Sequence, residues 1–131
     1  MQKTKTIDLN APELKSNNPM PSSVCLSPQG ALLIGTRGGE IMEVKGNAAP
    51  KVHLRAHFDS ELWGLAMHPS KTEMITVGRD AMLAVWDIPN RKQLLHVKLE
   101  GPADAVAISN NGAHIAVGHI SGKVVILDAQ F

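Results

Sequence analysis

Short apolar runs alternate with turn-forming residues along most of this chain. Between positions 61 and 88 the runs ELWGLAM, EMITV and MLAVWDI are separated by HPSKT and GRDA. Runs of this length bounded by Gly, Pro, Asn and Asp indicate strands joined in hairpins. Strict alternation along the first run would place Leu62, Gly64 and Ala66 on one face and Trp63, Leu65 and Met67 on the other. No segment combines helical periodicity with end caps. The pattern therefore predicts an all-β chain.

The same pattern occurs three times, in residues 24–44, 65–87 and 106–128. Equivalent turn residues follow one another at intervals of 41 positions, namely Ser27, His68 and Ser109. A period of about 40–45 residues is typical of a β-propeller blade. HEAT and armadillo repeats have a similar period, but they are helical, so the strand pattern favours blades.

A fourth strand can be assigned in two of the units, as KVHLRA (51–56) and KQLLHVKL (92–99). We therefore predict a single propeller segment, residues 1–131, made of four-stranded antiparallel blades in a partial or open propeller. The predicted blades span approximately 14–56, 57–100 and 101–131. The last blade would lack its outer strand, and residues 3–9 would be an orphan outer strand. Residues 10–22, rich in Pro, Asn and Ser, would form the longest loop.

The composition indicates which cellular compartment and which classes of partner to expect. Hydrophobic residues make up 44% of the 131 positions, which is enough for a substantial core. Lys plus Arg total 13 and Asp plus Glu total 12, a balance that argues against a nucleic-acid-binding protein. The single cysteine, Cys25, excludes an intrachain disulfide and suits a reducing compartment. Because no run is long enough to span a bilayer and the N-terminus lacks a signal-peptide core, we expect a cytoplasmic protein without a membrane partner.

The second unit contains polar residues at an informative spacing. Thr76 precedes Asp80 by four residues, the unit ends in Trp86-Asp87, and His57 lies 23 residues before Asp80. This set resembles a WD40 repeat, in which a His, a Ser or Thr, an Asp and a Trp form a buried hydrogen-bond network. The resemblance implies a structural network of His57, Thr76, Asp80 and Trp86, and buried groups of these kinds do need partners.

This unit departs from the WD40 pattern in two ways, and the other two units lack the set. Ala56 stands where a glycine usually precedes the histidine, and one extra residue separates His57 from Pro69. In the first and third units, Val44 and Leu127 occupy the tryptophan position. Those two units are therefore expected to be held together by packing alone.

Longer stretches resemble the echinoderm microtubule-associated protein-like family. They are AHFDSELWGLAMHPSKTEMITVGRDAMLAVWD (56–87), LLIGTRGGEIMEV (32–44) and AVAISNNGAHIAVGHISGKVVILDA (105–129). The resemblance covers most of residues 23–129 and implies a non-catalytic WD40 scaffold at the cytoskeleton, with tubulin or microtubules as partners. Family members are long, so this chain resembles a three-blade segment of one. It is expected to be a fragment; the alternatives are an open arc completed by a partner and a homodimeric six-bladed ring.

The sequence also contains residues of the types found in metal sites and in catalytic sites. Two histidines and two carboxylates within residues 57–68 lack any known metal-ligand spacing, so no metal or cofactor is expected. Cys25 or Ser60 could be paired with a histidine, but no nucleophile-elbow motif is present, and we assign no catalytic residue. Two alternatives remain: a generic WD40 adaptor that binds another protein or peptide, and a hydrolase that uses His and Asp residues.

Residues in the predicted turns are the better candidates for partner contact, because loops on a rigid scaffold carry function. Arg37, Arg79 and His119 fall at or beside one turn of each unit, and Arg91 and Lys92 fall in another turn of the second unit. Their positive charge would suit an acidic protein surface such as a microtubule.

Overall fold

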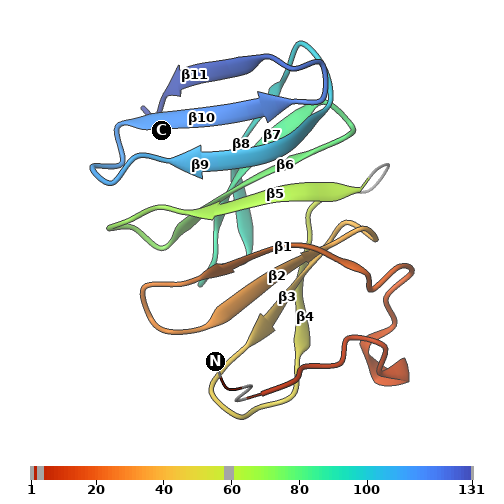
Figure 1. The fold of residues 1–131 in the computed structure, drawn as a ribbon. Coiled ribbons are helices and arrows are strands. Elements are labelled where there is room, and N and C mark those ends of the chain that lie inside the picture. Colours follow the sequence, from red (N-terminus) through yellow and green to blue (C-terminus); the bar gives the residue numbers. More distant parts are fainter. Residues whose placement is uncertain (1, 3–4, 58–60, 131) are drawn as a thin grey trace.

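The computed structural model describes residues 2, 5–57 and 61–130, and these residues form three antiparallel sheets stacked one above another (Figure 1). The first sheet has the order β1-β2-β3-β4. Its strands are β1 (Pro21–Leu26), β2 (Leu32–Thr36), β3 (Glu40–Val44) and β4 (Lys51–Arg55). Each strand pairs with the next one along the chain, so the sheet is a simple meander.

The second and third sheets repeat this meander. The second sheet is made of β5 (Leu62–Met67), β6 (Glu73–Gly78), β7 (Met82–Asp87) and β8 (Lys92–Lys98). The third is made of β9 (Ala103–Ile108), β10 (His114–His119) and β11 (Val124–Asp128). These bounds follow the apolar runs of the sequence. The predicted all-β class, with blades of a WD40-type propeller, is confirmed.

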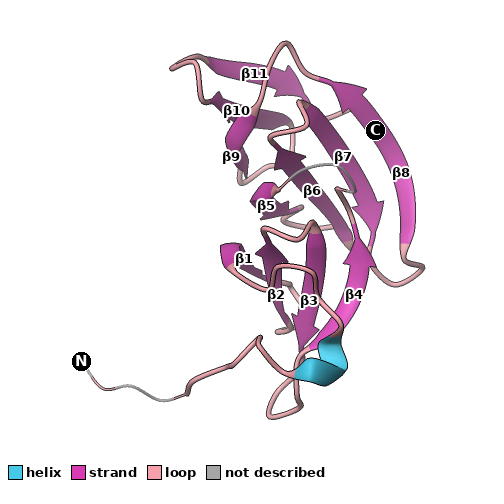
Figure 2. Cartoon of the chain, turned by 90° about the vertical axis from the view of Figure 1, so that its right-hand side faces the viewer, coloured by secondary structure: helices cyan, strands magenta, loops and turns pink. Residues whose placement is uncertain are grey.

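The three sheets form an open arc (Figure 2). The first strands of the sheets, β1, β5 and β9, line one side of the arc, and β4 and β8 lie on the other side. Along the inner side β1 contacts β5, and β5 contacts β9. This is the geometry of neighbouring propeller blades, whose inner strands converge on a common axis.

Apolar side chains fill the two spaces between the sheets. Between the first and second sheets, Leu33 and Ile41 pack with Leu62 and Met74, and all four are fully buried. A second cluster joins the other face of the second sheet to the third sheet. Its buried members are Ile75, Val77, Leu83, Val85, Ala103, Ile115 and Val117. The second sheet is therefore covered on both faces, which explains its nearly continuous apolar strands β6 and β7.

The N-terminal segment differs from its prediction. Residues 5–9 form no strand, and residues 3 and 4 lie outside the described part of the chain. Leu9 and Leu14, the last residue of a short 3-10 helix (Pro12–Leu14), are buried against Ile34 and Met42. Because the apolar side chains of this segment pack on the outer face of the first sheet, the segment crosses that face and does not extend a sheet edge.

Each inner strand contains a β-bulge near its start. In β5 the pairing changes between Leu62↔Gly78 and Gly64↔Val77, which leaves Trp63 as the extra residue. The bulge breaks the simple alternation predicted for this strand, so Leu62 and Leu65 join the same core cluster. Gly64 then lies close to β9, because a Cβ at this position would meet the Val106 backbone nitrogen at 2.9 Å.

Candidate protein-interaction surface

The four residues of the WD40-like set lie in one chain of hydrogen bonds. His57 Nδ1 is 2.6 Å from Asp80 Oδ2, and His57 Nε2 is 3.1 Å from Thr76 Oγ1. Trp86 Nε1 donates to the same hydroxyl at 2.9 Å. Strands β6 and β7 position Thr76 and Trp86, while His57 and Asp80 come from the segments that follow β4 and β6. These hydrogen bonds therefore tie the segment that joins the first two sheets to the centre of the second sheet.

This geometry does not suit His57 as a general base. Both ring nitrogens of His57 have partners, and the residue is only 3% exposed. A general base must reach the proton that it removes from a substrate. Cys25, a candidate nucleophile from the sequence, is half-buried, and burial raises the pKa of its thiol to about 11. Cys25 is therefore a neutral thiol near pH 7.

The first sheet has a buried polar network of its own, which the sequence reasoning missed. Glu40 is fully buried, and its carboxylate accepts hydrogen bonds from Thr36 Oγ1 at 2.6 Å and Ser16 Oγ at 2.9 Å. Arg55 Nη1 lies 3.3 Å from the same carboxylate. The expectation that packing alone holds this sheet was therefore wrong. The sequence contained a sign of this network, because Thr36 and Glu40 are separated by the same four positions as Thr76 and Asp80.

The bulged residues define one edge of the arc. They are Ser22 in β1, Trp63 in β5 and Asp104 in β9, and they follow one another at 41-residue intervals. Beside them lie the turns 37–39, 79–81 and 120–123, which connect β2 to β3, β6 to β7 and β10 to β11. We call these three bulges and three turns the bulge edge. Bulges change the direction in which side chains point. Charged and aromatic side chains lie together on this edge.

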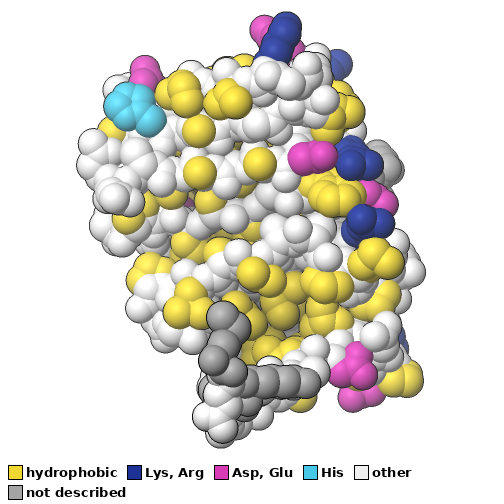
Figure 3. Space-filling view, viewed as in Figure 1, with side chains coloured by type: hydrophobic (Ala, Val, Ile, Leu, Met, Phe, Trp, Pro, Cys, Tyr) yellow, Lys and Arg dark blue, Asp and Glu magenta, His cyan; other side chains and the backbone are white. Residues whose placement is uncertain are grey.

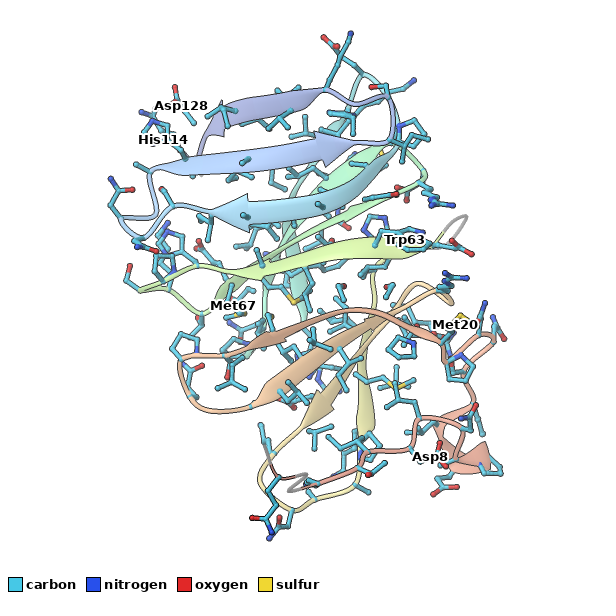
Figure 4. The ribbon with its side chains drawn as sticks, viewed as in Figure 1. Asp8, Met20, Trp63, Met67, His114 and Asp128 are labelled. Carbon is cyan, nitrogen blue, oxygen red and sulfur yellow. The ribbon has the colours of Figure 1, made fainter. Side chains whose placement is uncertain are left out.

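Trp63 is the centre of a cluster on the bulge edge. Its indole Nε1 donates to Glu61 at 2.7 Å, and the Arg79 guanidinium lies 4.2 Å from the centre of its ring. Arg79 also forms two hydrogen bonds with Asp104, at 3.1 and 3.3 Å. These bonds raise the pKa of Arg79 further above its ordinary value. Figure 4 shows Trp63 at the start of β5, on the side where the β2–β3 and β6–β7 turns lie.

Arg37 contacts the same tryptophan from the first sheet. Its guanidinium carbon lies 4.6 Å from the centre of the Trp63 ring. Its Nε is buried and has no hydrogen-bond partner among the residues that the structure describes. Figure 3 shows basic and acidic side chains gathered around an apolar group on the right-hand side of the molecule. The side chains of Arg79 and Asp104 are 44% and 38% exposed, so the cluster is accessible from outside. It includes residues of all three sheets.

The five turn residues expected to contact a partner do not share one surface. Arg37 and Arg79 lie together at Trp63, and His119 lies on the same edge, where its Nδ1 is 3.0 Å from the Gly101 carbonyl oxygen. Arg91 and Lys92 follow β7 and so lie at the opposite edge. There Arg91 borders a hollow of about 460 Å³ between the first two sheets. The sequence did not single out Trp63 as a contact residue, although its 41-residue relation to Ser22 and Asp104 was visible.

Two further properties concern cofactors and membranes. Within the described ranges, no three His, Cys, Asp or Glu side chains converge as a metal site would require. Residues 58–60, which include Asp59 and Ser60, lie outside those ranges. Over the part of the chain that the structure describes, no helix is long and apolar enough to cross a membrane.

Comparisons with known proteins agree with this fold. Residues 49–87 match the family model "WD domain, G-beta repeat". Echinoderm microtubule-associated protein-like 2 of Homo sapiens is 29% identical over 99 residues, which cover 76% of this chain and 15% of that protein. The 77 kDa echinoderm microtubule-associated protein of Strongylocentrotus purpuratus is 32% identical over 100 residues, covering 76% and 13%. The chain therefore spans a small part of the relatives that it matches.

A solved structure shows the same architecture. Kuenenia stuttgartiensis hydrazine synthase superposes with a TM-score of 0.74 over 87% of this chain and 34% of its own, at 19% identity. At that identity the likeness concerns the fold alone.

The stacked meanders, the bulged inner strands and the repeat match define a WD40-type β-propeller segment. More narrowly, residues 49–87 match one WD40 repeat, and the chain is similar to proteins named as echinoderm microtubule-associated over about three quarters of its length.

Proposed function

We propose that this chain is a non-catalytic WD40 scaffold and that its bulge edge binds a protein partner at the microtubule cytoskeleton. The observation that carries the proposal is the similarity over 76% of the chain to proteins named as microtubule-associated. The placement of Arg37, Trp63 and Arg79 on one accessible edge supports it. Aromatic and arginine side chains are the residue types most enriched at protein interfaces.

Charge favours tubulin as the partner. Microtubule surfaces are strongly acidic, and positive turn residues would attract such a surface over long range. The net charge of the chain is only +1, so attraction would come from local groups and not from the whole molecule. This proposal places the protein in the cytoplasm, at the cytoskeleton.

The assignment as a non-enzyme rests on the state of the reactive groups. His57 is buried with both ring nitrogens bonded, and Cys25 is a neutral thiol. A hydrolase using these residues would need to break the His57 network before it could act. Such an enzyme would lose activity in His57→Ala while the chain remained folded.

We further propose that residues 1–131 act as one propeller segment, with blades near 14–56, 57–100 and 101–131. Its two outer faces expose apolar side chains, among them Val24 and Leu26 on the first sheet and Val124 and Ile126 on the third. In the assembled protein these faces would be covered by further blades or by a second copy. Sedimentation of the purified chain as a monomer with a native-like fold would exclude the homodimer.

Co-sedimentation with polymerised tubulin across a salt series tests the microtubule proposal. We expect the chain to pellet with microtubules at low ionic strength and to dissociate as salt rises, because exposed charges are screened. An intact chain that stays in the supernatant at low salt, and also when fused into a full-length relative, would contradict it. A generic WD40 adaptor for another protein or peptide would then be the better description.

A further inference from the structure

We propose that Arg37, held against Trp63, is the receptor for a side-chain carboxylate of an acidic peptide segment in the partner. This inference rests on the proposed function, because it names the chemistry that the bulge edge recognises. It assigns different roles to the two arginines that contact Trp63. The charge of Arg79 is already paired by acids of the cluster, and Arg37 meets the ligand.

The difference between the arginines lies in their partners. Arg79 has its charge balanced by two hydrogen bonds to Asp104 and by Glu61 at 3.9 Å. Arg37 pairs with no carboxylate among the residues that the structure describes, and its buried Nε lacks a hydrogen-bond acceptor. A guanidinium carries five N–H donors in a planar fork that fits a carboxylate. Arg37 therefore has side-chain N–H donors without an acceptor among the described residues.

The site is also held in place before a ligand arrives. The β5 bulge directs Trp63 to the edge, and the bond from its Nε1 to Glu61 fixes the ring. Stacking on that ring restricts the Arg37 guanidinium, and burial of Nε has already removed part of its hydration. A preorganised, partly desolvated donor loses less entropy and less water when it binds an anion.

The surrounding charges favour a carboxylate over a phosphate or a nucleic acid. Glu61 and Asp104 lie within the same cluster and both pair with Arg79, so Arg37 is the arginine of the cluster with no carboxylate partner among the described residues. These acids would repel a doubly charged phosphate group more strongly than a singly charged carboxylate. A nucleic acid needs several uncompensated cations. A single carboxylate can reach Arg37 while the rest of an acidic side chain packs beside Trp63.

Fluorescence anisotropy on the full chain tests the inference. The probe is a fluorescein-labelled glutamate peptide of about ten residues, measured at low ionic strength beside a glutamine peptide of equal length. We expect Arg37→Gln to weaken binding of the glutamate peptide on the order of tenfold, as loss of a charge-assisted pair implies. Arg37→Lys should also weaken it, because lysine keeps the charge but lacks the planar fork.

Arg91→Gln is the matched control, since it removes the same charge at the opposite edge. It should change the affinity less than about twofold if the site is local. Circular dichroism and thermal unfolding of each variant must match the parent chain. Equal binding of the glutamine peptide, or equal weakening by the Arg37 and Arg91 substitutions, would overturn the inference. So would a phosphoserine peptide or an RNA oligomer that binds more tightly than glutamate through Arg37.

The outcome can be separated from that of the microtubule test. Glutamate binding that depends on Arg37, without pelleting on microtubules, would support the site and refute tubulin as its partner. Pelleting that Arg37→Gln leaves unchanged would support the proposed function and refute this inference.

Discussion

Trp86 combines the two kinds of interaction that hold the second sheet together. Its ring packs in the core cluster with Leu65 and Met74, and its N–H donates to Thr76. The same hydroxyl contacts His57, so one threonine serves two buried groups. A fully satisfied network of this kind rigidifies its surroundings, whereas a broken one leaves buried donors without partners.

Trp86→Ala is therefore expected to lower the free energy of unfolding by about 3–5 kcal/mol, from the cavity alone. Urea denaturation followed by circular dichroism measures the change. A loss below about 1 kcal/mol would mean that the tryptophan is not a core residue.

Glu40 is the polar centre of the first sheet, where its carboxylate bonds Thr36 as His57 bonds Thr76 in the second sheet. Its fully buried side chain connects Thr36 in β2 to Arg55 in β4 and to Ser16 in the N-terminal segment. It therefore ties that segment to the sheet. Removal of its charge would leave these donors poorly satisfied.

Glu40→Gln is expected to lower the free energy of unfolding by about 1–3 kcal/mol. Glu13→Gln is the control, because Glu13 is exposed and its substitution should change stability by less than about 0.5 kcal/mol. Equal effects of the two substitutions in denaturant titrations would show that the Glu40 network contributes nothing specific.

At the scale of elements, the turns on the bulge edge follow one backbone plan. Equivalent positions have φ of +77° at Gly39, +59° at Ala81 and +85° at Gly122. Glycine adopts this left-handed conformation readily, whereas a residue with a Cβ is strained there. The second turn therefore carries a backbone cost that its two counterparts avoid.

Ala81→Gly should raise the free energy of unfolding by about 0.5–1 kcal/mol, because relief of strain outweighs the added freedom of the unfolded chain. Ala84→Gly, inside β7, is the contrasting variant and should destabilise by about 1 kcal/mol or more. Chemical denaturation of both variants provides the comparison. If Ala81→Gly destabilises the chain as much as Ala84→Gly does, the strain argument is wrong.

Most of the elements could be predicted because their signals are local. Apolar runs and Gly or Pro turns place β4 to β8 within one or two residues of their observed bounds. The bulge at Trp63 could not be read from alternation, because an extra residue in one strand shifts the face of every residue beyond it. The N-terminal segment was mistaken for a strand because Ile7 and Leu9 alternate with polar residues, yet their partners lie on a distant sheet face.

At the scale of the whole molecule, the bulge edge depends on contacts between sheets that no single repeat contains. Arg37 belongs to the first sheet, Trp63 and Arg79 to the second and Asp104 to the third. The 41-residue period locates these residues within their repeats, but their convergence comes from the way the blades stack. This is why the sequence could name Arg37 and Arg79 but not their shared aromatic partner.

Hydrogen–deuterium exchange of the chain with and without polymerised tubulin tests the central claim most directly. We expect protection on binding at turns 37–39 and 79–81 and at the start of β5, with little change at turns 45–50 and 88–91 on the opposite edge. Protection confined to the opposite edge, or none at all under conditions where the chain pellets, would contradict it.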